Sequence, residues 1–143
     1  AAKGTVQVEE LFGVYPFKNV NQMISTVTCK TRAETSNWDI IKATFPMGSM
    51  TGAPKISAME LAERYEKTER GIYSGALGYI MPNGDFDFNV VIRSIALDAK
   101  QGVASAHVGG AITLLSIPER EYEECLLKAE SLLQSAAGSS SNQ

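Results

Sequence analysis

Histidine and cysteine are scarce in this chain of 143 residues. His107 is the only histidine, which argues against a metal site made of several histidines and against a catalytic triad that uses one. Cys29 and Cys125 are too few for a disulfide framework, and free thiols are the usual state of cysteine in the cytoplasm. We therefore expect a cytoplasmic protein without structural disulfides.

Long apolar runs and an excess of basic residues are also missing. No stretch approaches the length of a membrane span and no signal peptide opens the chain, so we expect no membrane partner. The net charge of −3 offers no broad basic surface for nucleic acid. Ala1 stands where an initiator methionine would be, which fits either a processed protein or a piece of a longer one.

The composition, with 44% hydrophobic and 20% charged residues, is typical of one globular domain. The expected strands, rich in β-branched and aromatic residues, lie within 4–31 and at 72–80, 86–97, 103–108 and 111–115. Turn signals between the later strands predict an antiparallel meander of three or four. The expected helices lie at 36–44, from a glycine-rich loop to about residue 67, and at 118–136. We expect Thr35 or Ser36 to cap the first, and Ser116 with Glu119 to form a capping box on the last.

The glycine-rich loop is the octapeptide Gly-Ser-Met-Thr-Gly-Ala-Pro-Lys at 48–55, directly before a helix. Its backbone N–H groups, hydroxyls and lysine suit an anion at the positive end of a helix dipole. It is not the P-loop of nucleotide hydrolases, because three residues rather than four separate Gly48 from Gly52 and Ile56 follows Lys55. On spacing alone, a well-capped turn before a core helix is an equally good interpretation.

The last helix carries two stripes. The apolar one, at helical spacing, is the expected core face and consists of Tyr122, Cys125, Leu126, Ala129, Leu132 and Leu133. Glu121, Glu124 and Lys128 form a bordering stripe. Its two carboxylates suit a hard cation such as Mg²⁺, and the lysine suits an anionic ligand. Spacing alone favours the alternative, a solvated helix face with a Glu124–Lys128 ion pair.

Polar groups also interrupt the expected strands. Arg93 would share a strand face with Asn89 and Val91, as a clamp for a carboxylate or as half of a structural ion pair. Tyr73 precedes Ser74-Gly75, where a ligand could approach the backbone beside a phenol, although a core or rim tyrosine is the commoner case.

A glycine pair and the histidine lie further along. Gly109-Gly110 predicts a bulge or backbone amides that face a ligand. His107 beside the pair is more often structural than a base.

The order of these segments is more specific than any one of them. The octapeptide, Tyr-Ser-Gly-Ala-Leu-Gly-Tyr at 73–79, Ile-Arg-Ser at 92–94, the glycine pair and Glu-Tyr-Glu-Glu at 121–124 resemble the C-terminal part of the chorismate-utilising enzymes. These enzymes include component I of anthranilate synthase, component I of aminodeoxychorismate (para-aminobenzoate) synthase, and the isochorismate and salicylate synthases. The similarity spans about residues 4–135, and the Thr-Gly-Ala-Pro-Lys form is most like the two aminating branches.

The resemblance implies half of a large α/β sandwich, with largely antiparallel strands and about three helices. Residues 1–137 would be the C-terminal portion of a chorismate-binding domain within a longer chain, and 138–143 a flexible tail. An upstream half would supply another glutamate for the metal and, in the para-aminobenzoate branch, a lysine nucleophile.

The implied activity is the Mg²⁺-dependent amination of chorismate at C4, towards para-aminobenzoate and folate, with ammonia from a glutamine amidotransferase subunit. One alternative is component I of anthranilate synthase, which aminates C2 and releases pyruvate, and another is a binding or assembly module without activity. Gln22 stands where the family usually has a histidine implicated in pyruvate loss. An amide cannot act as a general base, so this departure favours the para-aminobenzoate branch. A second departure is Ala111, in place of the second glycine of a Gly-x-Gly pattern.

The resemblance also assigns roles by position. Glu124 would bind Mg²⁺ with support from Glu121, and Glu121 and Lys128 would be the catalytic residues. The substrate-binding residues would be Ser49, Tyr73, Arg93, Gly109, Gly110 and Lys128.

Overall fold

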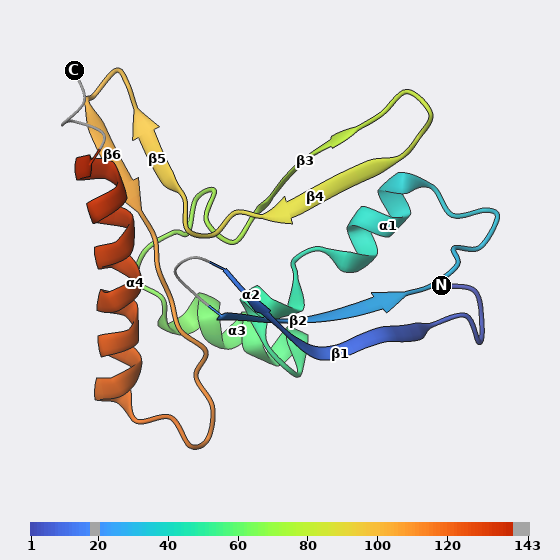
Figure 1. Ribbon diagram of the computed structural model, residues 1–143, viewed down its shortest axis with the longest axis horizontal. Helices are drawn as coiled ribbons and strands as arrows, with labels where there is room; N and C mark the ends of the chain where they lie inside the picture. The colour runs from blue at the N-terminus through green and yellow to red at the C-terminus, as the bar shows by residue number, and fades with distance from the viewer. Residues whose placement is uncertain (18–20, 139–143) are drawn as a thin grey trace. The chain divides into compact units, whose positions relative to one another are not determined.

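The computed structural model describes residues 1–17 and 21–138 (Figure 1), and its chain divides into two units, residues 1–43 and 44–143. In the first unit, β1 (Gln7–Pro16) and β2 (Asn21–Thr28) pair as an antiparallel hairpin. Two register shifts interrupt the pairing within β1, one between Val8 and Glu10 and one between Glu10 and Gly13, beside Phe12, whose φ is 57°. The strands predicted within 4–31 are therefore confirmed.

Helix α1 (Asn37–Thr44) begins at a reciprocal cap. The Ser36 hydroxyl accepts a hydrogen bond from the Asp39 N–H at 3.2 Å, and the Asp39 carboxylate accepts one from the Ser36 N–H at 3.0 Å. This arrangement satisfies two backbone donors near the helix start, which explains why α1 begins here. The expectation of a cap at 35–36 is confirmed, with Ser36 as the capping residue.

The octapeptide in the second unit is more helical than predicted. Its first four residues form the single helical turn α2 (Gly48–Thr51), and α3 (Lys55–Tyr65) follows. Pro54 lies at the N-cap of α3 with an extended backbone (φ −67°, ψ 139°), which suits a residue that has no N–H to donate.

The later strands form two separate antiparallel pairs, not one meander. β3 (Ala76–Ile80) pairs with β4 (Phe86–Val90), and β5 (Ile95–Asp98) pairs with β6 (Val103–Ala106). The predicted strand at 86–97 was wrong in its middle, where the chain bends and Arg93 has a φ of 49°. The one at 72–80 begins late, because residues 71–74 form a turn, and 111–115 is not a strand.

Helix α4 (Pro118–Gly138) ends one residue into the predicted tail, and residues 139–143 lie outside the described part of the chain. The predicted capping box was wrong, because the Ser116 hydroxyl accepts a hydrogen bond from the Thr113 N–H at 2.9 Å. The predicted core stripe was wrong for Tyr122, Leu126 and Leu133, which are 65%, 51% and 64% exposed. The better-covered side of α4 consists of Glu121, Cys125, Lys128, Ala129 and Leu132.

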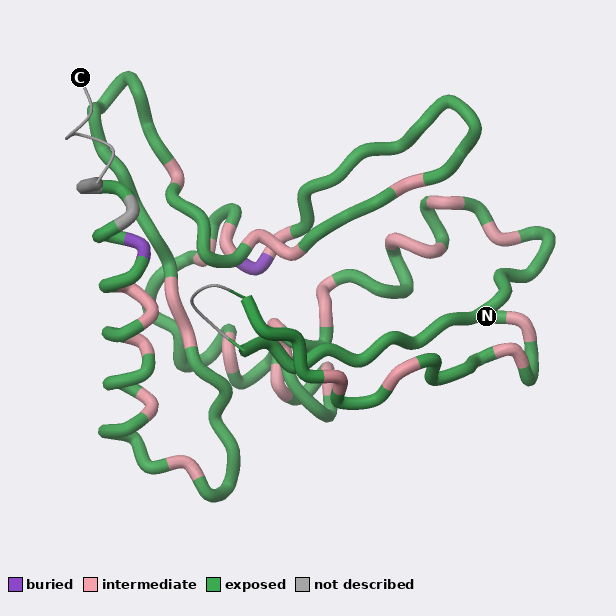
Figure 2. The backbone as a smooth tube through the Cα atoms, viewed as in Figure 1, coloured by how far each residue is buried: buried purple, intermediate pink, exposed green. Residues whose placement is uncertain are grey.

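Burial is slight throughout the described residues, among which only Ser74 and Leu132 are buried (Figure 2). Partly covered residues recur along one side of α4 and in the turn before β3. Among the helices of the described ranges, none has the length and hydrophobicity that a membrane span requires.

Candidate functional site

Tyr73 lies in the turn that precedes β3. The turn is joined to the end of β4, since the Ser74 N–H donates to the Val91 carbonyl at 3.0 Å and the Val91 N–H donates to Gly75 at 2.9 Å. The Tyr73 ring stacks on His107, with 5.8 Å between ring centroids and 22° between planes. This contact holds the half-buried phenol against the segment that follows β6.

The glycine pair after His107 passes between the phenol and α4. A Cβ on Gly109 would lie 3.0 Å from the Tyr73 hydroxyl, and one on Gly110 would lie 3.1 Å from a carboxylate oxygen of Glu121. Both distances are shorter than ordinary van der Waals contacts to carbon. Glycine at these positions therefore lets the backbone lie close to both side chains.

The charged stripe of α4 meets the same segment. The Lys128 Nζ donates to the Gly109 carbonyl at 3.0 Å and forms an ion pair with Glu124. The predicted Glu124–Lys128 pair is thus present, and it lies at the glycine pair rather than on an isolated solvated face. The structure brings six predicted site residues into one cluster, namely Tyr73, Gly109, Gly110, Glu121, Glu124 and Lys128.

A cleft of about 300 Å³ adjoins this cluster. Its walls are the segment from Gly110 to Pro118 and the first turns of α4, and its mainly apolar lining consists of Gly110, Ile112, Ser116, Pro118, Glu121, Tyr122 and Cys125. Glu121 is the one carboxylate among these lining residues, so it lies where an apolar wall meets the charged stripe.

The chemistry of the donors fits a partial magnesium site. Glu121 and Glu124 offer carboxylate oxygens from one helix, and Mg²⁺ is commonly held by one or two carboxylates with water and substrate oxygens. Within residues 1–17 and 21–138, no group of three or more histidine, cysteine, aspartate or glutamate side chains is placed to hold a metal. The described residues thus provide two ligands and leave other positions for oxygens from elsewhere.

Ser49 and Arg93 lie outside the cluster. Ser49 is exposed on α2, and Arg93 is exposed in the bend between β4 and β5. Arg93 does not share a strand face with Asn89 and Val91, and that prediction was wrong, because the strand ends at Val90. In the described part of the chain, no hydrogen bond or ion pair joins either side chain to the cluster, and their roles stay predictions.

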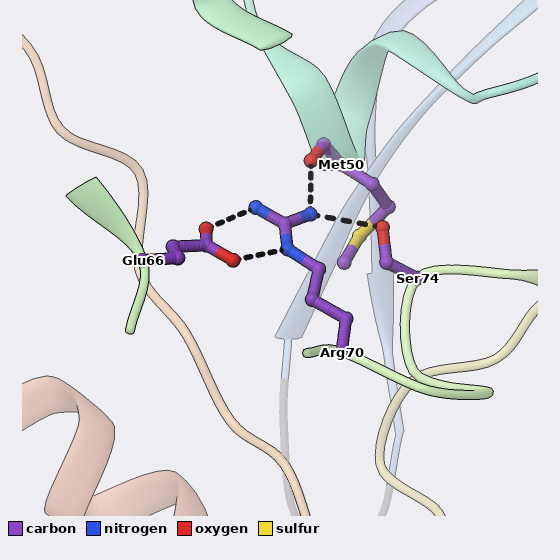
Figure 3. Close-up of polar contacts among 4 residues, drawn as sticks. All are labelled: Met50, Glu66, Arg70 and Ser74. Carbon is purple, nitrogen blue, oxygen red and sulfur yellow. Dashed lines mark hydrogen bonds and ion pairs between the residues drawn. The ribbon is translucent and has the colours of Figure 1, made fainter. Parts of the chain in front are cut away.

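Arg70, for which no role was predicted, joins three segments (Figure 3). Its guanidinium is bidentate to Glu66, and its Nη1 donates to the Met50 carbonyl at 2.9 Å and to the Ser74 hydroxyl at 3.0 Å. The hydrogen bonds from Arg70 lower the pKa of the Glu66 carboxyl below its ordinary value. The four-residue spacing of Glu66 and Arg70 was the one sequence signal for this pair.

Known proteins resemble this chain over most of its length. Residues 1–134 match the family of chorismate binding enzymes. A probable chloroplastic aminodeoxychorismate synthase of Oryza sativa is 47% identical over 127 residues, which are 89% of this chain and 14% of that protein. Anthranilate synthase component 1 of Methanothermobacter thermautotrophicus is 43% identical over 132 residues, which are 92% of this chain and 28% of that protein.

A solved structure of a protein from this family has a similar fold. Anthranilate synthase component I from Streptococcus pneumoniae aligns with a TM-score of 0.75 at 35% identity, over 90% of this chain and 29% of that one. The predicted fold class is confirmed by this likeness and by the antiparallel strand pairs with three longer helices among the described residues. The chain spans less than a third of each of these proteins and belongs to the family of chorismate binding enzymes.

Proposed function

We propose that this chain is the C-terminal part of an aminodeoxychorismate synthase component I, which aminates chorismate at C4. The observation that carries the proposal is the cluster around the glycine pair, where a phenol, backbone groups, a lysine and two carboxylates meet. Chorismate is a dianion, and its recognition requires cations and hydrogen-bond donors, which the lysine and the phenol of this cluster can supply.

Each group has a proposed task. Lys128, Tyr73 and the amides at Gly109 and Gly110 hold the carboxylates of chorismate, with Arg93 as a further clamp and Ser49 near the ring. Glu124 and Glu121 hold Mg²⁺, a Lewis acid that polarises the departing C4 hydroxyl. Lys128 and Glu121 are the proposed catalytic residues, because they lie in the cluster that is proposed to hold chorismate and Mg²⁺.

The ion pair between Lys128 and Glu124 bears on this assignment. A carboxylate oxygen that accepts from the ammonium is not free to bind a cation with the same lone pair. If Mg²⁺ were held by that oxygen, the Lys128 ammonium would be left free to bind a substrate carboxylate.

Two observations support the para-aminobenzoate branch. The similarity to the Oryza sativa aminodeoxychorismate synthase is 47% and that to the Methanothermobacter anthranilate synthase is 43%. Gln22 lies in β2, where its amide donates to the Met23 carbonyl at 3.4 Å. An amide has no proton-accepting role at neutral pH, which suits a reaction without pyruvate loss. Anthranilate formation is the alternative.

The proposal includes a glutamine amidotransferase subunit as the ammonia donor and a cytoplasmic location. Cys29 and Cys125 are free thiols, which suits a reducing compartment.

Product identification tests the function directly. The full-length protein is incubated with chorismate, ammonium and Mg²⁺, and the products are separated by liquid chromatography and identified by mass. We expect aminodeoxychorismate. Anthranilate with pyruvate would replace the proposal by its alternative, and binding of chorismate without turnover would favour a non-catalytic module.

A further inference from the structure

We propose that Arg70 is a positioning residue that holds the turn carrying Ser49 and the turn carrying Tyr73 in one fixed arrangement. The inference rests on the proposed function, in which both residues bind substrate. Arg70 itself touches neither of the proposed substrate contacts, and it acts through the residues next to them, Met50 and Ser74.

The contacts of Arg70 are directional. One edge of the guanidinium is bidentate to Glu66, just after α3, and Nη1 points to the Met50 carbonyl and the Ser74 hydroxyl (Figure 3). A planar guanidinium with several fixed donors sets both distance and orientation, whereas a lysine ammonium provides only a point charge. Glu66 thus orients the guanidinium, and the guanidinium joins the segments of Met50 and Ser74.

The Ser74 contact controls Tyr73. Ser74 is one of the two buried residues in the described chain, and its φ of 71° is unusual for a residue other than glycine. Such a backbone persists only where surrounding contacts fix it. The hydrogen bonds from Arg70 to the Ser74 hydroxyl and from the Ser74 N–H to Val91 provide these contacts. They aim the preceding phenol at His107 and Gly109.

The Met50 contact controls the turn that bears Ser49. A four-residue helix such as α2 has little stability of its own, because helix nucleation is unfavourable. Arg70 satisfies the Met50 carbonyl near the C-terminal end of this turn. One guanidinium therefore organises a turn of the octapeptide and the turn before β3, whose bonded residues Met50 and Ser74 are 24 positions apart in sequence.

The first test measures kinetics in the full-length protein. In Arg70→Ala we expect KM for chorismate to rise on the order of tenfold, with KM for ammonia unchanged. Arg70→Lys should leave KM for chorismate nearly as high as Arg70→Ala does, since lysine restores the positive charge without the planar set of donors of the guanidinium. The matched control is Arg64→Ala, an exposed arginine of α3 that lies over the Tyr65 ring, and its KM should stay at the wild-type value.

A double mutant separates positioning from general weakening. In a Tyr73→Phe background, the effect of Arg70→Ala on KM should shrink, because the contact that Arg70 positions is already lost. An unchanged KM in Arg70→Ala, or equal effects of Arg70→Ala in both backgrounds, would overturn the inference. Wild-type protein that does not turn over chorismate would instead refute the proposed function.

A spectroscopic test is independent of activity. His107 stacks on Tyr73, so the ring resonances of this histidine report the position of the phenol. They are assigned in ¹³C-histidine-labelled protein by their loss in His107→Gln. We expect Arg70→Ala and Arg70→Lys to shift these resonances and Arg64→Ala to leave them in place. Unshifted His107 resonances in both Arg70 variants would contradict the positioning role.

Discussion

At the residue scale, Glu124 has two competing partners, the Lys128 ammonium and the proposed Mg²⁺. We expect Glu124→Gln in the full-length protein to abolish Mg²⁺ binding, measured by calorimetry, and to lower kcat/KM by on the order of a hundredfold to a thousandfold. The fold should be nearly unaffected, since an exposed ion pair contributes about 0–1 kcal/mol.

Glu123→Gln is the matched control, because it makes the same change at the neighbouring exposed position. It should retain both metal binding and activity. If Glu124→Gln binds Mg²⁺ as the wild-type protein does, then Glu124 is not a ligand and the Lys128 pair is only structural.

Gly109 gives a second prediction at this scale. Because a Cβ here would lie 3.0 Å from the Tyr73 hydroxyl, Gly109→Ala should push the phenol away by a few tenths of an ångström. We expect a higher KM for chorismate and a shifted His107 resonance. Gly48→Ala serves as the control for the NMR readout, because a Cβ at Gly48 meets nothing within 4 Å. A normal KM in Gly109→Ala would show that the close approach has no functional role.

Among the elements, α1 has a cap that makes the stability of the folded state depend on pH through the Asp39 carboxyl. The hydrogen bonds from Ser36 lower the pKa of the Asp39 carboxyl below its ordinary value of 3.8. A carboxyl with a lowered pKa stabilises the folded state fully above its unfolded pKa, and this contribution is lost as the pH falls through the folded pKa. Ser36→Ala should therefore raise the pKa of Asp39 towards 3.8, measured by NMR titration of the carboxyl carbon. The same titration in Ser57→Ala should match the wild-type curve, and an unmoved pKa in Ser36→Ala would show that the cap does not cause the shift.

The elements also show what local sequence can predict. The first hairpin, α1 and α4 follow from strand propensity, a capping residue and helical periodicity, which are properties of neighbouring residues. The turn at Ser74 and the bend at Arg93 do not follow from local sequence, because both residues have a positive φ without being glycine. At Ser74 the conformation depends on partners distant in sequence, such as Val91.

In the candidate site, too, some residues could be predicted from local sequence and others could not. Periodicity placed Glu121, Glu124 and Lys128 on one face of a helix, and the structure adds Tyr73 and the glycine pair beside them. Arg70 was missed because its partners, Met50 and Ser74, come from separate turns that no local pattern joins.

At the scale of the whole molecule, the exposure of apolar side chains is the dominant property. Among the described residues only Ser74 and Leu132 are buried, and large apolar side chains are exposed in both units. Leu114 and Leu115, which precede α4, are 99% and 89% exposed. Apolar surface of this extent is seldom left in contact with water, and the relatives that match this chain are several times longer.

This exposure predicts how the 143-residue chain behaves when it is produced alone. With so few buried residues, it should bind the dye ANS and unfold without a sharp calorimetric transition, because cooperative unfolding needs a packed core. It should not turn over chorismate with ammonia and Mg²⁺, since its two carboxylates are only part of the proposed metal site. The full-length protein, assayed in parallel, is the positive control for melting and for product. A sharp transition without ANS binding would show that the exposed side chains pack together in solution, and aminodeoxychorismate from the chain alone would show that Glu121 and Glu124 suffice for the metal.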